Sequence, residues 1–383
     1  MLNRRTIRIK AMQSLFAFEQ CKQSNYHLAL DFIEESFQPD LNSMEVQNKP
    51  LLRAQAKEAR QLFIKNYKDA NANVHSGSVD KINEVVLKAI ADYHSQLTKD
   101  RKHLRSSMLR DAEAIYKRYA WMLWLPTVLS RLASLEKERK GITPQTNFVE
   151  NKLIQQLKDS KQLEQSYLKS GFSWEKETEE LRLWLKEIIF KDETYLEYLR
   201  KENPTYEEDK EIVMYLTKSI IFKHENIELY MENIDLYWSE NRLILRSMIA
   251  KTLKSIEEGD SDFELTEMSY NWEEDKEFFE MIFEKTLDEE AKYEDMIAQK
   301  AKNWDIDRIS ETDKILLEMA IQEMINFPAI PVKVTINEYI EISKKYSTPK
   351  SKQFVNGVLD VIAVDLQEQG IIRKSGRGLI DNK

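Results

Sequence analysis

Glycine is scarce in this chain, at 8 of 383 residues, about a third of the usual share of about 7%. Nucleotide-binding folds need glycines where the backbone must approach a phosphate closely or turn left-handed. Only Gly376 and Gly378 lie close together, and the spacings GxGxxG, GxxxxGK[ST] and GxSxG do not occur. The sequence therefore argues against nucleotide-binding α/β enzymes and serine hydrolases.

Cysteine and histidine are scarce as well. Cys21 is the sole cysteine, which excludes an intrachain disulfide and a thiolate zinc cluster. The five histidines are scattered and form no HExxH pair. We therefore expect no metal centre and no bound cofactor. The sequence also lacks a run of 18 apolar residues that would span a membrane, and we expect a cytoplasmic protein.

The hydrophobic periodicity is helical almost throughout the chain. Ile7, Ala11, Leu15 and Phe18 are spaced i, i+4, i+8 and i+11, which places them on one face of a first helix. Similar spacings recur near the C-terminus, where Ser351 is a suitable N-cap for the last main helix. Because strand-like alternation between turn residues is missing, we expect an all-α fold.

Large aromatic residues recur at nearly regular intervals in the middle of the chain. Successive members are separated by 32, 32, 34 and 32 residues: Trp174, Tyr206, Trp238, Trp272 and Trp304. The sequence IIFK at Ile188–Lys191 also returns 32 residues later. A unit of this length holds a helix pair, which favours degenerate helix-pair repeats. A tryptophan-rich helical chain also shows such spacings by chance, so both interpretations stay open.

The net charge of −9 conceals a strong separation of charge along the chain. Between Glu257 and Asp295, 17 acidic residues stand against 3 lysines, a local net charge of −14. Basic runs lie at both ends of the chain and between Lys99 and Arg110. A single run is typical of a solvated face. Together they suit a protein that holds an anion and a basic partner at once.

The first helix carries a candidate RNA-binding face. At about 100° per residue, Arg5 and Phe16 point within about 20° of one another, away from Ile7 and Ala11. A guanidinium neutralises phosphate and an aromatic ring stacks on a base, as single-stranded RNA binding requires. The same face would also suit packing against inserted helices, with Phe16 in the core.

Two C-terminal stretches decide between these interpretations. They are Lys333–Ile342 (KVTINEYIEI) and Ser351–Asp360 (SKQFVNGVLD), and they closely resemble the signature of the bacterial NusB family. Arg308, Asp313 and Glu323 match the helix that precedes this signature, and the N-terminal arginines resemble the family's arginine-rich first helix. The resemblance covers roughly 1–37 and 272–374, a little over a third of the chain.

The resemblance implies a fold and a function. NusB proteins are all-helical, are built from two small bundles and are not enzymes. They bind the boxA element of nascent ribosomal RNA leaders together with NusE, a small-subunit ribosomal protein. That complex joins elongating RNA polymerase and suppresses premature termination. Carried over by position, the RNA-binding surface comprises Arg4, Arg5, Arg8, Gln13, Phe16, Lys350, Ser351, Lys352 and Phe354.

Physical reasoning agrees with part of this surface. Lys350 and Lys352 flank the free amide groups of a helix N-terminus, which is itself an anion site. A solvated basic turn is the alternative, and Phe354 fits the core as well as it fits RNA. For the protein partner, the resemblance places Asp313 on the face that meets NusE. Ribosomal proteins are mostly basic, so the acidic stretch with Glu277, Glu280 and Glu284 suits NusE by electrostatic steering; keeping a helix soluble is its other role.

The chain departs from the family in its length. We expect residues 1–37 to be the first helices, 38–271 an inserted helical region, 272–374 the main NusB-like part and 375–383 a flexible tail. The basic run Lys99–Arg110 either extends the RNA path or is an exposed helix face. If the insertion covers the first helix, the assignment of Arg5 and Phe16 fails.

Two further functions compete with antitermination, and the sequence leaves homodimerisation of the free protein open. A helical-repeat scaffold without sequence-specific RNA binding is the alternative. The NusB domain also occurs fused to an RNA cytosine methyltransferase, but the glycine-rich cofactor turns and a second cysteine are absent.

Overall fold

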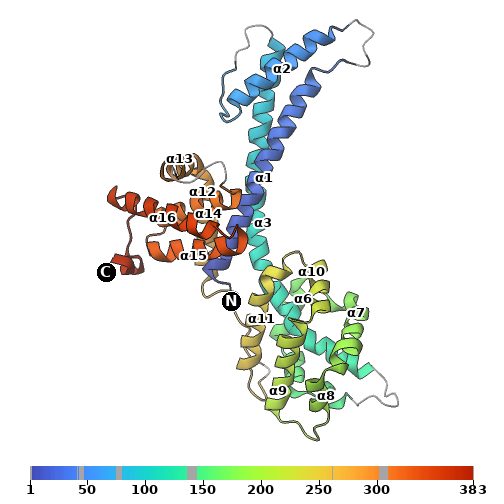
Figure 1. The fold of residues 1–383 in the computed structure, drawn as a ribbon. Coiled ribbons are helices and arrows are strands. Elements are labelled where there is room, and N and C mark those ends of the chain that lie inside the picture. Colours follow the sequence, from blue (N-terminus) through green and yellow to red (C-terminus); the bar gives the residue numbers. More distant parts are fainter. Residues whose placement is uncertain are drawn as a thin grey trace. The chain divides into compact units, whose positions relative to one another are not determined.

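The computed structural model describes residues 2–40, 42, 47–74, 80–135, 145–260, 262–301 and 309–382. Within these residues the regular structure is helical and includes no strand, which confirms the all-α prediction (Figure 1). None of the helices in this described part is long and apolar enough to cross a membrane.

The chain divides into two compact units. Unit 1 comprises Met1–Arg4 and Arg110–Asp275, and unit 2 comprises Arg5–Leu109 and Lys276–Lys383. The expected insertion is therefore divided between the units, because residues up to Leu109 belong with the first helix and the C-terminal helices. The sequence pattern did not reveal this division, since it falls inside one continuous helix, α3 (Asp80–Leu135).

Unit 2 contains almost all of the first helix, the C-terminal helices and most of the family-like residues. Its helices are α1 (Arg4–Ser36), α2 (Lys49–Asn66), the first part of α3, α12 (Trp272–Asp288), α13 (Glu290–Lys300), α14 (Glu311–Asn326), α15 (Val332–Tyr346), α16 (Ser351–Glu368) and the 3-10 helix η6 (Gly376–Asn382). Every side chain of α14 from Ile315 to Met324 is buried, so α14 forms the centre of the C-terminal bundle. The predicted apolar face of α1, from Ile7 to Phe18, is buried as well.

The far half of α1, together with α2 and the first part of α3, forms an arm with a core of its own (Figure 1). Ile33, Phe63 and Val86 contribute one fully buried side chain from each of the three helices. Asn48 caps α2 by accepting a hydrogen bond from the backbone N–H of Leu51 at 3.1 Å. These contacts fix which face of α2 points inward.

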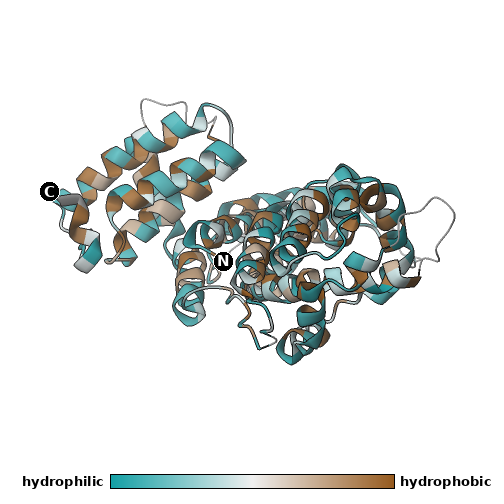
Figure 2. Ribbon diagram, turned by 90° about the horizontal axis from the view of Figure 1, so that it is seen from below, coloured by the Kyte–Doolittle hydropathy of each residue, from teal (hydrophilic) through white to brown (hydrophobic). Residues whose placement is uncertain are grey.

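Unit 1 is a bundle of shorter helices around the second part of α3. These elements are α4 (Thr146–Val149), α5 (Lys152–Asp159), α6 (Lys161–Ser170), η1 (Trp174–Glu177), α7 (Thr178–Leu183), η2 (Trp184–Ile188), η3 (Ile189–Lys191), α8 (Glu193–Leu199), α9 (Tyr206–Tyr215), η4 (Leu216–Ile221), α10 (Glu225–Ile234) and α11 (Trp238–Ser255). Hydrophobic residues line the inward faces of the helices and hydrophilic residues the outward faces (Figure 2). Trp174, Trp184 and Trp238 are fully buried.

The 32-residue spacing recurs in the geometry of unit 1. Helix α7 runs into the π-helical turn η2, and α9 runs into the π-helical turn η4, which begins 32 residues after η2. Trp174, Tyr206, Trp238 and Trp272 each occupy the first position of a helical element. Trp304 lies outside the described residues, and the degenerate helix-pair repeat stays a prediction.

The segment 375–383, expected to be a flexible tail, contains the 3-10 helix η6. The backbone N–H of Ser375 donates a hydrogen bond to the carbonyl oxygen of Pro328 at 3.0 Å. A Cβ atom at Gly378 would lie 2.0 Å from that same oxygen, so only glycine permits this close approach.

Candidate nucleic-acid interface

The start of α1 is anchored by a buried arginine. Arg8, 3% exposed, donates two hydrogen bonds of 2.7 Å to the carboxylate of Glu323 on α14. Glu323 also accepts from the hydroxyls of Thr335 at 2.8 Å and Tyr339 at 3.1 Å. Burial opposes the charge of Arg8, but the adjacent Glu323 carboxylate outweighs it and raises the arginine pKa. Arg8, predicted to bind RNA, instead holds α1 against α14 and α15 in this structure.

Arg5 lies one turn before Arg8 and faces solvent. Its guanidinium donates two hydrogen bonds of 2.7 Å to Glu338 of α15, yet 47% of the side chain stays exposed. The hydrogen bond to Arg5 is the main cause that lowers the pKa of Glu338. Phe16 is 39% exposed, whereas Met12, which lies between Arg5 and Phe16 on this face, is buried. The angular prediction for these two residues agrees with their exposure.

The remaining predicted residues of α1 are in mixed environments. Gln13 is half-buried. Arg4 belongs to unit 1, where it pairs with Glu274 and lies 3.6 Å from the carboxylate of Asp275. Leu2 is tied to the same unit by a 2.7 Å hydrogen bond from its N–H to the carbonyl oxygen of Met268. Arg4 and Arg5, although adjacent in the sequence, thus pair with carboxylates of different units.

At the start of α16, exposed and buried residues alternate. Lys350 and Lys352 are exposed, whereas Ser351 and Phe354 are buried. Ser351 is the first residue of α16 rather than its N-cap, a position that Lys350 occupies. The Ser351 hydroxyl donates a 2.6 Å hydrogen bond to Asp313 at the start of α14.

Asp313, expected on the NusE-binding face, is itself 5% exposed. Its backbone N–H donates to the hydroxyl of the α14 N-cap, Ser310, at 3.1 Å. One carboxylate oxygen is occupied by Ser351. Asp313 and Ser351 therefore join the N-termini of α14 and α16, which fixes where the two flanking lysines stand.

The predicted acidic partner face of α12 meets the basic run of α3. Glu277 is exposed. Glu284 accepts a 2.7 Å hydrogen bond from Nε of Arg101, and Glu280 lies 3.3 Å from Nη2 of Arg105. The two arginines, Glu280, Glu284 and their neighbours line a groove of about 420 Å³ between α3 and α12. The run Lys99–Arg110 is thus not simply an exposed face, because two of its arginines bind α12.

A cluster of three carboxylates beside α13 is the arrangement closest to a metal site among the described residues. Oxygen atoms of Glu290, Glu294 and Glu318 lie within 4.8 Å of one another. Lysine ammonium groups occupy two of them, Lys22 at 2.5 Å from Glu290 and Lys314 at 2.5 Å from Glu294. Burial raises the pKa of Glu318 to about 9 despite Lys314, whose ammonium is 4.0 Å away. The lysines neutralise two of the three carboxylates, and the raised pKa of Glu318 favours its protonated form at neutral pH.

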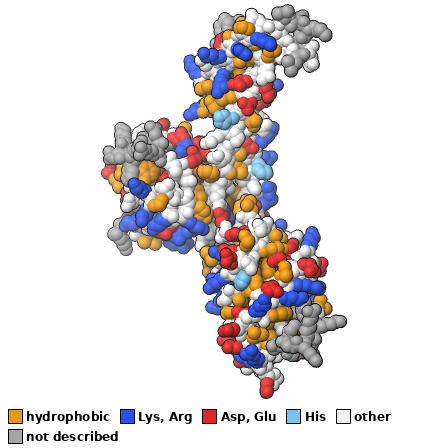
Figure 3. All heavy atoms as spheres, turned by 45° about the vertical axis from the view of Figure 1, so that its right-hand side comes forward, with side chains coloured by type: hydrophobic (Ala, Val, Ile, Leu, Met, Phe, Trp, Pro, Cys, Tyr) orange, Lys and Arg blue, Asp and Glu red, His pale blue; other side chains and the backbone are white. Residues whose placement is uncertain are grey.

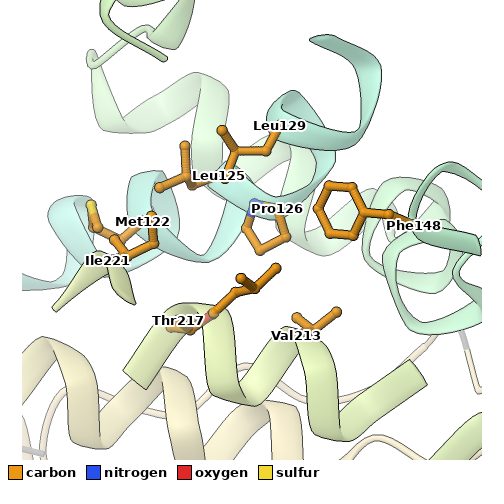
Figure 4. Close-up of a pocket in the computed structure, with 9 residues that line it drawn as sticks. Met122, Leu125, Pro126, Leu129, Phe148, Val213, Thr217 and Ile221 are labelled. Carbon is orange, nitrogen blue, oxygen red and sulfur yellow. The ribbon is translucent and has the colours of Figure 1, made fainter. Parts of the chain in front are cut away.

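Unit 1 has a small apolar cavity between α3, α9 and η4 (Figure 4). Its volume is about 10 Å³, and Pro126, Phe148 and Val213 are among its lining residues. That space holds at most about one water molecule, and Thr217 is the one polar residue among those that line it. It is too small for a cofactor.

Comparison with known proteins identifies the chain's relatives. The family model described as NusB family matches residues 243–364. A protein from Salinibacter ruber is 42% identical over 141 residues, which cover 35% of this chain and 88% of the relative. The chain belongs to the NusB family. A relative from Bacillus pumilus is 41% identical over 92 residues, 24% of this chain and 70% of its own length.

A third NusB relative, from Chloroherpeton thalassium, is 42% identical over 106 residues, covering 28% of this chain and half of the relative. All three relatives are named transcription antitermination protein NusB. No solved structure matches the chain.

The NusB match begins inside α11 and ends inside α16. It contains the two lysines at the start of α16, Asp313 and the acidic face of α12, but not the arginines of α1. Sequence reasoning missed Glu323 and Glu338 as the partners of Arg8 and Arg5. The available signal was Glu323 itself, a carboxylate close to the apolar residues Ala320, Ile321 and Met324, which must find a cation or hydroxyl when buried.

Proposed function

We propose that this protein is an RNA-binding transcription antitermination factor. It binds boxA-type elements of nascent ribosomal RNA together with NusE and prevents premature termination by RNA polymerase. Membership of the NusB family supports the general role. The observation that carries RNA binding is the exposure of Arg5 and Phe16 on one face of α1.

The proposed RNA surface consists of exposed groups held by buried ones. Arg5 and the two lysines at the start of α16 supply positive charge for phosphates, and Phe16 supplies a ring for base stacking. Gln13 is a further member on α1, and Arg4, which belongs to unit 1, is proposed as a separate RNA contact. Arg8, Ser351 and Phe354 act beneath the surface, where they position α1 and α16.

For NusE we propose the acidic side of α12. Glu277 is exposed, whereas Glu280 and Glu284 contact Arg105 and Arg101. A basic ribosomal protein would therefore approach Glu277 first and compete with these arginines for the other two carboxylates. Asp313 acts from within, through Ser351.

The test is binding of a labelled boxA-like RNA, with and without NusE, against a scrambled RNA of equal length. We expect preference for the boxA-like RNA that tightens with NusE and weakens in Arg5→Ala and Lys352→Ala. Lys158→Ala, which removes an exposed cation of unit 1, serves as the matched control. Equal and weak binding of both RNAs, unaffected by the variants, contradicts the proposal.

A helical-repeat scaffold is the second candidate, and the two π-helical turns spaced 32 residues apart favour it. Salt dependence separates the two functions. Four phosphate contacts give a log–log slope of about −3 for single-stranded RNA, at about −0.7 for each contact. A scaffold would bind RNA weakly and without sequence preference.

A further inference from the structure

The outer face of α2 carries a row of positive charges. Lys49, Arg53, Lys57 and Arg60 are all exposed and are spaced i, i+4, i+8 and i+11. At about 100° per residue they lie within about 80° of one another, and at about 1.5 Å per residue they span about 16 Å. We call these four residues the α2 basic row.

Packing of the arm core fixes this row toward solvent. Ala59 and Phe63 lie about 120° and about 80° around α2 from the centre of the row, at about 100° per residue, and both are fully buried against α1 and α3. Phe63 contacts Tyr26 of α1 and Tyr93 of α3, with ring centroids 5.7 Å and 6.5 Å apart. Rotation of α2 would expose these rings, so the row has one stable orientation.

The charge of the row is largely uncompensated. Helix α2 contains five Lys/Arg residues and one glutamate, a net charge of +4 in a chain with a net charge of −9. Arg60 pairs with Glu34 at 2.6 Å across an exposed surface. Within the described part of the chain, Lys49, Arg53 and Lys57 have no carboxylate within 4.0 Å. Arg8, Arg101 and Arg105, by contrast, are all paired with carboxylates of their own unit.

The row lies at the opposite end of α1 from Arg5 (Figure 1). Helix α1 has 33 residues, so these ends are separated by about 48 Å at about 1.5 Å per residue. Lys and Arg side chains stand on the visible surface of this end of the arm (Figure 3). A ligand that reaches both sites must therefore be an extended polyanion.

We propose that the α2 basic row binds the phosphate backbone of RNA, as a second contact for the strand held at Arg5 and Lys352. The identity of the strand rests on the proposed function, whereas backbone binding rests on the row itself. Its cations rise in steps of about 6 Å and about 4.5 Å, which suits a polymer with regularly spaced charges. Because α2 offers no exposed aromatic ring, the contact is electrostatic and independent of sequence.

An anionic membrane is a poorer match for this surface. A helix that lies in a membrane surface buries an apolar face in the lipid. The apolar face of α2 is already used by the arm core, and its exposed apolar residues, Leu51 and Ile64, stand at opposite ends of the helix. RNA needs no such face.

The experiment uses the full chain and two RNAs that share one boxA-like element. One RNA has about 10 nucleotides and covers about 34 Å when stacked, and the other has about 40 nucleotides and covers about 136 Å. The variant Arg53→Gln/Lys57→Gln neutralises the centre of the row. The control Lys158→Gln/Lys161→Gln removes the same charge from exposed positions of unit 1.

Removal of two phosphate contacts should weaken binding of the long RNA about 25-fold at 0.1 M salt and reduce the magnitude of its salt slope by about 1.4. The variant should bind the short RNA as tightly as the wild type does. The control should bind both RNAs as tightly as the wild type does. Unaltered binding of the long RNA would overturn the inference, as would an equal loss for both RNAs at unchanged melting temperature. Loss of binding to phosphatidylserine vesicles or to polyglutamate, with RNA binding intact, would also overturn it.

Scrambled RNAs of both lengths separate this inference from the proposed function. If the short RNA is bound no better than its scrambled form, the proposed function fails. The α2 contact is then tested by the long scrambled RNA alone. It is supported if the variant binds this RNA more weakly than the wild type does, and contradicted if the affinities are equal.

Discussion

The two ends of α1 hold positive charge in opposite ways. At the N-terminal end, Arg8 is buried against Glu323 in a network with two hydroxyls, and its charge serves the fold. At the far end, Ile33 and its neighbours form an apolar core, and the cations of α2 stand at the surface, where Arg60 pairs with Glu34. A cation buried in a network positions a helix, whereas the exposed cations of α2 remain accessible to an anionic ligand.

The largest expected effect comes from breaking the buried network. Arg8→Ala leaves the carboxylate of Glu323 buried without its cation, which typically costs about 3–5 kcal/mol. Arg5→Ala removes an ion pair that is half-exposed and should cost about 0–1 kcal/mol. Urea denaturation of the two variants measures both values. Similar losses for both would show that burial does not separate the two pairs.

The next effect comes from the apolar end of the helix. Ile33→Ala removes a fully buried side chain from the arm core and should cost about 2–5 kcal/mol of local stability. Hydrogen exchange should accelerate at the amides of α2 and the first part of α3, while those of α14 keep their protection. Equal acceleration in α14 would show that the arm and the bundle unfold together.

The buried ion network beside α13 adds a pH dependence to the bundle end. The pKa of Glu318 is about 9 in the folded chain, against an ordinary value of 4.5. Between these values the folded state holds a proton that the unfolded state releases, so this carboxyl lowers the free energy of unfolding as pH rises.

We compare the free energies of unfolding of Glu318→Gln and the wild type. From pH 5 to pH 8 the difference should shift in favour of Glu318→Gln by about 1–3 kcal/mol, since one proton contributes at most about 1.4 kcal/mol per pH unit. The nearby ammonium of Lys314 reduces the effect. Denaturation curves of both proteins at the two pH values provide the measurement. A difference that is the same at pH 5 and pH 8 would show that Glu318 is ionised when folded.

The sequence predicted the helical fold and the buried face of α1 well, because both depend on local periodicity. Ile7 and Phe18 are buried and Phe16 is exposed, as a period of 3.6 residues requires. The family signature likewise located the residues at the start of α16. Each of these features depends on residues that are close together in the sequence.

Pairings between distant segments could not be predicted from the sequence. Arg8 and Arg5 look alike in α1, and only the fold gives one of them the buried partner Glu323. The basic run of α3 and the acidic run of α12 were interpreted separately, although Arg101 and Glu284 contact each other. The division of the insertion at Leu109 falls inside one helix, where no composition change marks it.

The smallest expected effect concerns Arg5, the exposed arginine at the start of α1. Glu338→Gln removes the carboxylate that holds Arg5, and an exposed pair of this kind is worth about 0.2–1 kcal/mol. If phosphate and Glu338 compete for the same guanidinium, the variant should bind the boxA-like RNA about 2–5-fold more tightly. Glu187→Gln, which frees Lys191 of unit 1 rather than Arg5, should leave the affinity unchanged. Weaker binding by Glu338→Gln would mean that Glu338 instead orients Arg5 toward the RNA, because a competitor cannot strengthen binding by its presence.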